Sequence, residues 1–387
     1  MHILISAQSY PSPKNQLSAF VAVLAEEMVR QGVEVTVLAP QSLTTFWKHK
    51  IPLCPQKYKV KISTPNGIRE MTILRPFSFS LGQGRFYKLS IRIDRFVINR
   101  AAKRLKTRPD IIYSHFWKAA DNIIDYAVKY GIPSFVATGE DEITIDKYFS
   151  VQRVSLLREN TKGVICVSTK NQEESITHHL TERSRTIVLP NAVNHKEFYP
   201  IGQKVAREQL GYSQDDFIVA YCGRFNTRKG CRRVSDAITL LNDPQIKSIF
   251  IGIASGGILE EPECDGMLFK GSLNHNEIVT YLNAADVFVL PTQAEGCSNA
   301  IIEAMACGLP IISSDLPFNY DILNESNAIM VDPMDVRQIA DAIMVIKKNP
   351  ERQRSMSEAS LETAKKLSIE NRVSSILEFI KEQNNKK

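Results

Sequence analysis

The sequence predicts an α/β protein with two parallel-sheet domains. Short runs rich in valine, isoleucine and leucine alternate with amphipathic helical patterns along both halves of the chain, which is typical of βαβ units. The 387 residues suffice for two domains of ordinary size, each with its own hydrophobic core. Near the middle, Pro190 and Pro200 frame a stretch of restricted flexibility that is suited to a hinge between the domains.

The composition argues against several classes of protein. Hydrophobic residues make up 43% of the chain and charged residues 23%, which is typical of globular proteins. No run approaches the length of about 18 apolar residues of a membrane-spanning helix, and the first residues lack the pattern of a signal peptide. The seven cysteines are scattered, which favours reduced thiols and argues against a structural zinc site. We therefore expect a cytoplasmic protein that holds no metal.

The first half begins with the pattern of a Rossmann-like unit. An apolar run at residues 2–7 predicts a strand, apolar residues at helical spacing predict a helix over 17–30, and residues 33–38 predict the next strand. Gly32 closes the helix and is the first glycine of the chain, so the glycine fingerprint of dinucleotide-binding domains is absent, which counts against an NAD enzyme. Three more strands are predicted in this half, at residues 110–114, 134–138 and 164–168.

Polar residues follow these strands at the edge where parallel sheets bind ligands. In the first loop, which lacks glycine, Ser9, Ser12 or Ser18 would supply the polar contacts. His115 comes directly after a predicted strand. A lone histidine there is more often structural than catalytic, and spacing alone leaves both roles open.

Positive charge gathers in the first half. The chain has a net charge of +6, and between Lys48 and Arg108 it carries sixteen cations opposed only by Glu70 and Asp94. Part of this excess falls on residues 85–108, within which residues 86–106 predict a helix. No aromatic-interleaved platform accompanies the charge, which counts against nucleic acid as the partner.

The helix predicted over 86–106 combines apolar and basic side chains. One face would be formed by Leu89, Ile93, Phe96 and Val97, while Arg92, Arg95 and Lys103 take other faces. A basic amphipathic helix can lie on an anionic membrane surface. Alternatively, the apolar stripe packs on the sheet and the cations are solvated, and the sequence leaves both interpretations open.

The second half contains a glycine-bounded basic loop. A strand predicted at residues 217–222 ends in GRFNTRKG, residues 223–230, which precedes a helix. Gly223 lets a ligand approach the backbone, and Arg224 and Lys229 place two cations near an opening of phosphate size. Arg228 is expected to face solvent. Considered alone, all three cations also fit an ordinary charged loop surface.

The most informative segment is DVFVLPTQAEGCSNAIIEAMACGLPIISSDLPFNYD, residues 286–321. It predicts a strand, a loop, a short helix closed by Gly308 and a second strand, so the loop opens at the carboxyl end of the first strand. Glu295 lies in the loop and Glu303 about one turn into the helix. Two acids flanking this loop suit the hydroxyl groups of sugars, although the spacing fits solvated residues equally well.

The start of this helix is suited to phosphate. Ser298 or Asn299 is placed to cap it, and the backbone N–H groups of Ser298, Asn299 and Ala300 face the mouth of the loop. The positive end of the helix dipole attracts anions there. Together with the two acids, these residues suggest a site for a sugar nucleotide.

The segment EGCSNAIIEAMACGLPIISSD resembles the signature of the retaining glycosyltransferases of family 4, which have the GT-B fold and two glutamates separated by seven residues. The resemblance is strong from Tyr221 to Asp321 and weaker in the first half. It implies two Rossmann-like domains facing a central cleft. These are an acceptor-binding domain at residues 1–188, a nucleotide-sugar-binding domain at 189–366, and a terminal helix at 367–387 that crosses back to the first domain.

The resemblance also implies roles for individual residues. Glu303 would hold the ribose hydroxyls and Glu295 those of the donor sugar, while Arg224 and Lys229 stabilise the leaving diphosphate without a metal. The backbone around Lys270 would read the edge of the base. The resemblance also places the diphosphate against Gly223 and the helix start, Ser298, Asn299 and Ala300. It places His115 at the mouth of the site.

Three departures from the family pattern stand out. The first loop lacks glycine, Ala192 stands where glycine is usual, and Thr138 replaces a common histidine, so that Glu140 or Asp141 would have to contact a sugar hydroxyl there. The resemblance implies sugar transfer from a nucleotide diphosphate sugar to a glycan or lipid-linked acceptor in bacterial surface-polysaccharide assembly, with contact to the inner face of an anionic membrane. A sugar-nucleotide epimerase or hydrolase, and a catalytically silent nucleotide-binding partner, remain alternatives.

Overall fold

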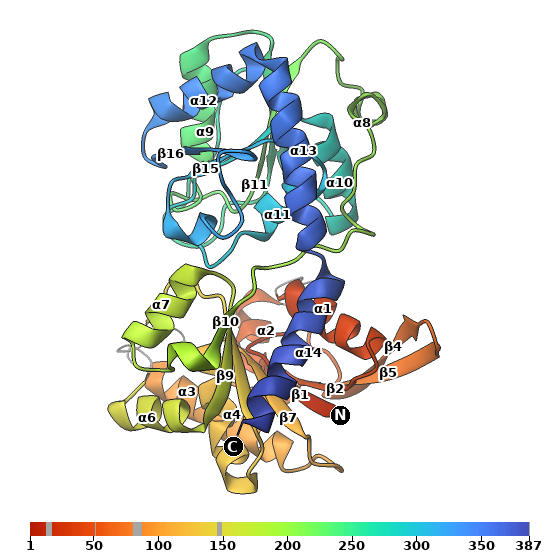
Figure 1. Ribbon diagram of the computed structural model, residues 1–387, viewed down its shortest axis with the longest axis vertical. Coiled ribbons are helices and arrows are strands. Elements are labelled where there is room, and N and C mark those ends of the chain that lie inside the picture. Colours follow the sequence, from red (N-terminus) through yellow and green to blue (C-terminus); the bar gives the residue numbers. More distant parts are fainter. Residues whose placement is uncertain (13–17, 51, 80–86, 145–148, 387) are drawn as a thin grey trace. The chain divides into compact units, whose positions relative to one another are not determined.

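The computed structural model describes residues 1–12, 18–50, 52–79, 87–144 and 149–386 (Figure 1). The chain divides into two compact units. Unit 1 consists of Met1–Leu189 together with Arg372–Lys387, and unit 2 is Pro190–Asn371. Within the described ranges, no helix is both long and apolar enough to cross a membrane.

Unit 1 is built on an eight-stranded sheet. All its neighbouring strands run parallel except the outermost pair, which forms an antiparallel hairpin at one edge. In spatial order the strands are β10 (Thr186–Val188), β9 (Thr161–Cys166), β8 (Ser134–Thr138), β7 (Ile111–His115), β1 (His2–Ser6), β2 (Glu34–Leu38), β5 (Gly67–Leu74) and β4 (Lys57–Thr64). The central strands are buried on both faces, as expected for a parallel sheet that helices cover.

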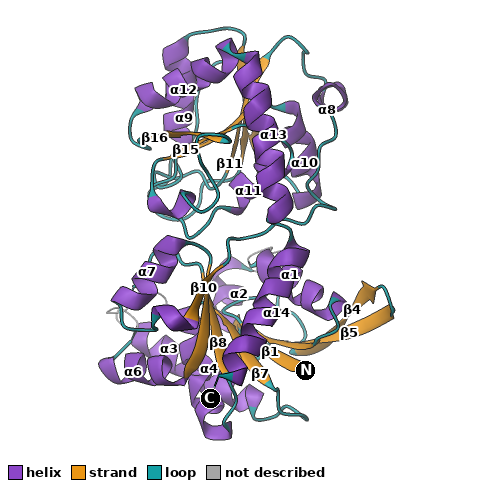
Figure 2. Ribbon diagram, in the orientation of Figure 1, coloured by secondary structure: helices purple, strands orange, loops and turns teal. Residues whose placement is uncertain are grey.

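Helices cover both faces of this sheet (Figure 2). On one face α3 packs beside α4, and α4 beside α6. A short pair of strands, β3 (Gln41–Ser42) and β6 (Phe77–Ser78), lies outside the main sheet. The helices are α1 (Ala19–Arg30), α2 (Leu43–His49), α3 (Tyr87–Ala102), α4 (Trp117–Tyr130), α6 (Val151–Asn160), α7 (Thr169–Thr177), the 3₁₀ turn η1 (Arg183–Arg185) and most of α14 (Ile369–Asn385).

Helix α3 packs through residues that the predicted apolar stripe does not include. Its buried residues include Ile91 and Ile98, which lie seven residues apart and therefore on one face. Leu89 and Phe96, two members of the predicted stripe, are 46% and 65% exposed. Of the two interpretations that the sequence left open, packing of the stripe on the sheet therefore does not hold for these two side chains. The predicted start at Phe86 lies outside the described residues.

Unit 2 contains a six-stranded sheet whose neighbouring strands are all parallel. The chain starts in the middle, moves outward to one edge and then returns to build the other half, so the direction of winding reverses between β11 and β14. Ligands of such sheets bind at this reversal point, outside the carboxyl ends of the strands. The spatial order is β13 (Met267–Gly271), β12 (Ile246–Ile251), β11 (Phe217–Cys222), β14 (Val287–Leu290), β15 (Ile311–Ser314) and β16 (Ala328–Val331).

The helices of unit 2 flank both faces of its sheet (Figure 2). Helix α9 packs beside α12, and α11 beside α13. Gly308 follows α11 with a φ of +81°, which confirms the predicted glycine at the end of this helix. The helical elements are α8 (Gln203–Leu210), α9 (Cys231–Leu241), α10 (His275–Ala284), α11 (Asn299–Ala306), the 3₁₀ turn η2 (Pro317–Asn319), α12 (Val336–Lys348) and α13 (Pro350–Lys366).

The predicted α/β class with two Rossmann-like sheets is confirmed. Strands β8 and β11 begin and end at the predicted residues, and β14 and β15 are the two strands predicted within residues 286–321. The strand predicted at 164–168 begins earlier, at Thr161. The sequence interpretation missed the β4–β5 hairpin. Leu17, the predicted first residue of the first helix, lies outside the described residues, and α1 starts at Ala19.

Candidate active site

Two loops meet at the reversal point of the unit 2 sheet. The first, residues 223–230, follows β11, and the second, residues 291–298, follows β14. Arg233 joins them, because its guanidinium donates to the carbonyl of Thr227 at 2.8 Å and to that of Pro291 at 2.9 Å. Arg233 is only 7% exposed, so it holds the two loops together from beneath. A planar guanidinium suits this bridging because its donors form a rigid fork.

Arg228 makes a second connection between the loops. Its guanidinium donates to the carbonyl of Ala294 at 2.9 Å, and its own carbonyl accepts the backbone N–H of Gln293 at 2.8 Å. The expectation that Arg228 faces solvent was therefore wrong. The loops hold each other through both the backbone and a side chain, which fixes the intervening space before any ligand enters.

Asn226 sets the shape of the first loop. Its amide donates to the carbonyls of Ser255 and Gly256, both at 2.7 Å, while its side-chain oxygen accepts the backbone N–H of Lys229 at 3.0 Å. Gly256 lies beneath Arg224, since a Cβ atom added there would come within 3.1 Å of the guanidinium. Arg224 is thereby placed over a small residue in the loop that follows β12.

Lys229 and Glu295 form an ion pair across the two loops. The side chains are 14% and 9% exposed, and the hydroxyl of Thr292 also donates to Glu295, at 3.3 Å. An ammonium group has further hydrogens to donate after one contact is made, so Lys229 can bind an anion while it still touches Glu295. The structure thus brings together the two residues that the sequence separates by more than sixty positions.

The N-terminus of α11 adjoins the second loop. Ser298 occupies the N-cap position and is 5% exposed, but its side chain makes no capping hydrogen bond, and neither does that of Asn299. The predicted side-chain cap was therefore wrong. The first N–H groups of a helix have no partner within the helix and carry its positive partial charge. At this helix they are left to a ligand or to water.

Glu303 lies one turn further along α11, in a partly buried and charged setting. Burial raises the pKa of this carboxyl to about 6, while His275 opposes the shift and Glu197 adds to it. His275 itself pairs with Glu197 at 3.2 Å, and this carboxylate raises the pKa of the imidazole. Burial raises the pKa of the Cys222 thiol at the end of β11, the charge of Glu303 raises it further and that of Lys229 lowers it. These two charged groups therefore lie near the end of that strand.

Lys270 is placed differently from the other predicted residues. It lies in β13, the edge strand, where its ammonium contacts the carboxylate of Glu261 at 3.0 Å and the carbonyl of Pro262 at 3.5 Å. None of its described contacts reaches Lys229 or Glu295. The side chain of Lys270 is half-exposed and bonded to Glu261, so the predicted contact to the base would have to come from its backbone.

In unit 1, His115 ends β7 at the corresponding reversal point, between β7 and β1. The imidazole is 7% exposed and stands edge-on to the rings of Phe20 and Tyr113, with ring centres 5.4 and 5.3 Å away. Burial, with a smaller effect of Arg372, lowers its pKa to about 3. His115 is therefore neutral at physiological pH, and its Nε2 atom has no hydrogen-bond partner among the described residues.

Glu140 has a structural task. One carboxylate oxygen accepts the backbone N–H of Trp117 at 2.8 Å, which caps the start of α4. The other accepts the hydroxyl of Thr138 at 2.6 Å and the backbone N–H of Gly139 at 2.9 Å. Both oxygens of Glu140 are therefore engaged within unit 1, and its contact to a sugar hydroxyl stays a prediction. Thr138 does not take over the role of a histidine but helps to hold this carboxylate.

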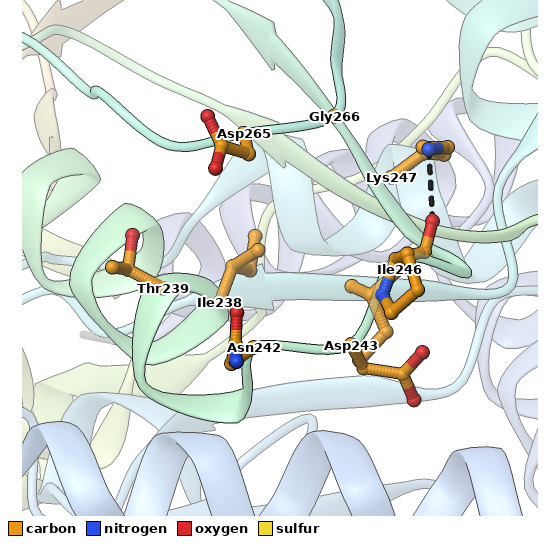
Figure 3. Close-up of a pocket in the computed structure, with 9 residues that line it drawn as sticks. Ile238, Thr239, Asn242, Asp243, Ile246, Lys247, Asp265 and Gly266 are labelled. Atoms are coloured by element: carbon orange, nitrogen blue, oxygen red, sulfur yellow. Dashed lines mark hydrogen bonds between the residues drawn. The ribbon is translucent and has the colours of Figure 1, made fainter.

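A separate cavity of about 230 Å³ opens elsewhere in unit 2 (Figure 3). It is lined by the end of α9, by Asp243 and Lys247 near the start of β12, and by Asp265 and Gly266. This is the amino-terminal edge of the strands, opposite the edge that carries the two loops, and none of the predicted site residues lines it. Across the described ranges, no group of three His, Cys, Asp or Glu side chains is placed to hold a metal ion.

Sequence reasoning missed the residues that support the site. Arg233 and Asn226 hydrogen-bond to the loops, and the charges of the pair His275–Glu197 act on the pKa of Glu303. The available signal was weak. An arginine in the first turn of a helix directly after a glycine-bounded loop suggests such a bridge, but no local pattern shows that Arg233 is buried.

Comparisons with known proteins identify the family of this chain. Residues 202–363 match the family of glycosyl transferases group 1, and residues 17–197 match Glycosyltransferase Family 4. TuaC of Bacillus subtilis (strain 168), a glycosyltransferase named for teichuronic acid biosynthesis, is 26% identical over 355 residues, which cover 89% of this chain and 88% of TuaC. The alpha-galactosylglucosyldiacylglycerol synthase of Streptococcus pneumoniae (strain ATCC BAA-255 / R6) is 28% identical over 52% of this chain and 56% of its own.

Solved structures share the whole fold. The sucrose-phosphate synthase of Thermosynechococcus elongatus matches with a TM-score of 0.79 and 20% identity, covering 100% of this chain and 99% of its own. Anabaena Alr3699/HepE, solved in complex with UDP and glucose, matches with a TM-score of 0.69 and 17% identity over 99% and 100% of the two chains. With both halves of the chain matched by family models, this protein belongs to the family 4 glycosyltransferases of GT-B fold, which are retaining, metal-independent transferases that use nucleotide sugars.

Proposed function

We propose that this enzyme transfers a sugar from a UDP-sugar to a hydroxyl group of a glycan or lipid-linked acceptor during assembly of a bacterial surface polysaccharide. The observation that carries the donor part is the buried pair of Lys229 and Glu295 at the reversal point of the unit 2 sheet. The pair places a cation that can bind a phosphate group beside a carboxylate that can accept hydrogen bonds from sugar hydroxyls. UDP as the carrier is supported by Alr3699/HepE, which shares the fold and was solved with UDP and glucose.

Charge stabilisation at the diphosphate is the main catalytic effect that we assign. As the bond to the donor sugar breaks, negative charge grows on the leaving UDP. Lys229 is held by its ion pair and the N–H groups at the start of α11 by the helix before the reaction, so their contacts strengthen as this charge develops, and we assign the exposed Arg224 to the same charge. The bridge through Arg233 keeps the two loops from relaxing apart, which preserves this arrangement.

The two glutamates receive different roles. Glu303 accepts hydrogen bonds from the ribose hydroxyls, most strongly in its ionised form, and His275 favours that form. Glu295 accepts from hydroxyls of the donor sugar while it holds Lys229 toward the diphosphate. Thr292 fixes the carboxylate from the other side at 3.3 Å.

For the acceptor, the retaining chemistry is front-face attack, in which an oxygen of the leaving phosphate takes the proton of the attacking hydroxyl. A neutral His115 fits this scheme, because burial keeps it from serving as a base that stores a proton. Its role is then to hydrogen-bond a hydroxyl group through the unpartnered Nε2 atom. The nature of the acceptor is supported by TuaC and by the diacylglycerol-linked name of the pneumococcal relative.

The donor part is tested by the thermal stability of the purified protein with UDP, GDP, ADP and their sugar conjugates. A ligand at about 100 times its dissociation constant stabilises the folded state by roughly 2.7 kcal/mol. We expect a rise in Tm with UDP and UDP-sugars and none with GDP or ADP. A rise with GDP or ADP alone would refute the choice of base, and no rise with any of them in folded protein would refute the donor site.

A hydrolase or epimerase that uses the same donor remains the alternative activity. It would consume UDP-sugar at full rate without an acceptor, whereas a transferase releases UDP slowly until the acceptor hydroxyl is supplied. Donor turnover is therefore measured alone and then with lipid extracts of a polysaccharide-producing bacterium. A rate that does not respond to any acceptor fraction would favour the alternative. A silent nucleotide-binding partner would show the Tm shift and no turnover in either arm.

A further inference from the structure

Arg75 is a buried cation at the carboxyl edge of the parallel strands of unit 1. It directly follows β5, which runs parallel to β2, and β2 in turn runs parallel to β1 (Figure 1). The residue is only 7% exposed. Arginines are almost never enclosed to this extent unless an acid pairs with them. The surroundings of Arg75 therefore decide what its charge is for.

No acid balances Arg75 among the residues that the structure describes, because its only side-chain contacts there are to a carbonyl and a sulfur atom. Its charge acts on the phenol of Tyr10, but burial raises the pKa of Tyr10, so this phenol is neutral at physiological pH. Glu26, which also acts on Tyr10, pairs with Arg30 at 3.2 Å. Arg75 is thus a buried charge without a counter-ion.

Two of the three guanidinium nitrogens of Arg75 have no partner. Nη1 donates to the carbonyl of Pro11 at 3.2 Å and lies 3.4 Å from the Sγ atom of Cys54, which is a weak acceptor. Nε is enclosed without a partner, and Nη2 makes no hydrogen bond to any described residue. Nε and Nη2 share one edge of the planar group. Such an edge can bind two oxygens of one carboxylate or phosphate.

Gln41 holds the chain around Arg75 in place. Its amide donates to the carbonyl of Arg75 at 2.9 Å and to that of Cys54 at 2.8 Å, and its side-chain oxygen accepts the backbone N–H of Cys54 at 2.9 Å. The backbone N–H of Arg75 donates to the carbonyl of Gln56 at 2.7 Å. Gln41 is 7% exposed, so these contacts are shielded from water. The guanidinium is therefore positioned before a ligand arrives.

Arg75 lies away from the reversal point of the unit 1 sheet. His115 ends β7, and the strand order β7, β1, β2, β5 puts three strand spacings between the two residues. At about 4.8 Å for each spacing, the separation is roughly 14 Å. A group bound at Arg75 would therefore belong to a part of the acceptor beyond the hydroxyl group that we place at His115.

We propose that Arg75 binds an anionic group of the acceptor, a carboxylate or a phosphate that lies beyond the reacting hydroxyl. The anion accepts hydrogen bonds at the edge formed by Nε and Nη2, and it supplies the opposite charge that the fold does not. Pairing is favourable because the cation has already lost its water during folding. The acceptor is thereby an acidic glycan or a phosphate-bearing one. The inference rests on the proposed function, since it assigns the anion to the acceptor of the transfer reaction.

A purely structural role is less consistent with the contacts of Arg75. A brace for the segment at Pro11 uses Nη1 alone. It does not account for a buried charge whose other two nitrogens have no partner. The tests below therefore use readouts that respond to an anion and not only to the stability of the fold.

The first test compares glucose, glucuronate and glucose 6-phosphate, which share one ring and differ in a single exocyclic group. Each sugar is titrated into the full chain at constant ionic strength, with saturating UDP to occupy the cations of the donor site. We expect glucuronate or glucose 6-phosphate to bind at least tenfold more tightly than glucose. The preferred anion tells a carboxylate acceptor from a phosphate acceptor. Equal affinity for all three sugars would overturn the proposal.

The second test removes the fork of donors. Arg75→Gln should lower the affinity for the preferred anion at least tenfold, and Arg75→Lys should fall between Arg75→Gln and the wild type, because lysine keeps the charge but lacks the fork. The matched control is Arg69→Gln, which removes the same charge from an exposed position on β5. Unchanged anion binding in Arg75→Gln, or an equal loss in Arg69→Gln, would contradict the proposal.

A third test uses the wild-type side chain and does not depend on the stability of a variant during titration. In protein labelled with isotopic arginine, the Nε–H resonance that is missing from the NMR spectrum of Arg75→Lys belongs to Arg75. The preferred anion should shift this resonance, whereas glucose should leave it in place. A resonance that ignores the anion at saturation would refute binding at this edge.

Failure of this proposal and failure of the proposed function give different results. A missing Tm shift with UDP in the wild type counts against the donor site, and the three sugars are then compared in Lys229→Ala without UDP. Anion preference that disappears in Lys229→Ala and persists in Arg75→Gln would place the anion in unit 2 and overturn the role of Arg75. In transfer assays, Arg75→Lys should raise the KM for an acidic acceptor fraction and leave the KM for the UDP-sugar unchanged.

Discussion

The two units place polar residues at equivalent positions of their sheets but use them differently. In unit 2, Lys229 and Glu295 meet between loops that Arg228 and Arg233 hold together. In unit 1, Glu140 is turned inward to cap α4, and His115 is buried and neutral. One reversal point is therefore charged and braced, while the other is largely uncharged.

This difference indicates a division of labour. A braced, charged site suits a ligand whose charge increases during the reaction, since preorganised groups need not rearrange as the charge develops. An uncharged site suits neutral hydroxyl groups, which need shape and single hydrogen bonds. The comparison supports the proposed donor site in unit 2 and the proposed acceptor site in unit 1, and each prediction below perturbs one side of it.

The largest effect is expected from Lys229→Ala or Arg224→Ala. Either change should lower turnover at least tenfold, or about 1.4 kcal/mol of transition-state stabilisation, because a cation at the leaving diphosphate is lost. Arg232→Ala is the control, since Arg232 is half-exposed on the same segment and pairs with Asp236 at 2.8 Å. Steady-state kinetics compare the variants. Equal rates for Lys229→Ala, Arg224→Ala and Arg232→Ala would remove the donor role of these cations.

The next effect is the dependence of donor binding on pH. Glu303 accepts strong hydrogen bonds through both oxygens when it is ionised, whereas the protonated form keeps only one weaker acceptor oxygen, and burial raises its pKa to about 6. Affinity for UDP should therefore be full well above pH 6 and fall as the pH drops through 6, by up to about tenfold at one unit below. The pH profile of the dissociation constant, measured by calorimetry, checks this.

Two variants sharpen the pH prediction. Glu303→Gln should bind UDP weakly at every pH and lose the step near pH 6. His275→Gln removes the charge that favours ionised Glu303, so the step should move to higher pH. Glu197, which pairs with His275, also titrates nearby and is kept unchanged in both variants. A profile that is identical in wild type and Glu303→Gln would contradict the assignment.

A smaller effect, on stability, is expected from Arg233→Ala. The change leaves the carbonyls of Thr227 and Pro291 without a buried partner, which should cost about 1–3 kcal/mol in the free energy of unfolding. Arg233→Lys should restore little, because an ammonium cannot reproduce the fork of two donors. Urea unfolding with and without UDP measures both effects. Full stability in Arg233→Ala would show that the loops are held by other contacts.

The smallest effect on the donor site is expected from Glu140→Gln. In the variant, the NH2 group of the glutamine replaces one carboxylate oxygen and faces at least one hydrogen-bond donor among Trp117, Thr138 and Gly139. That donor loses its acceptor, so the free energy of unfolding should fall by about 1–3 kcal/mol. Affinity for UDP should stay within twofold of the wild type. Loss of UDP binding at a temperature where the variant is folded would break the proposed separation between the units.

Much of the fold could be predicted because its strands are short, apolar and buried on both faces. Strands β8 and β11 were predicted at the correct residues, and β14 and β15 within residues 286–321, for this reason. The β4–β5 hairpin was missed because its exposed strand reads KYKVKIST, in which lysines interrupt the apolar pattern. The packed face of α3 could not be chosen from the sequence, because two apolar stripes compete and only the contacts in the fold decide between them.

Lys229, Glu295 and Glu303 could be proposed as site residues from the sequence, because they lie in loops after predicted strands or in the segment that resembles the family signature. What could not be predicted depends on contacts between distant segments. Arg228 was expected in solvent but bonds to Ala294, and Glu140 was expected at a sugar but bonds to Trp117. Such partners lie from about twenty to more than sixty positions apart, and no local spacing reveals them.

The most direct test of the division between the units is calorimetric titration of UDP into three variants at pH 7.5. We predict that Lys229→Ala and Glu303→Gln weaken binding strongly, whereas His115→Ala, in the other unit, leaves the dissociation constant within twofold of the wild type while it lowers transfer to the acceptor. Loss of UDP binding in His115→Ala, together with unchanged binding in Lys229→Ala and Glu303→Gln, would contradict the assignment of the donor site to unit 2.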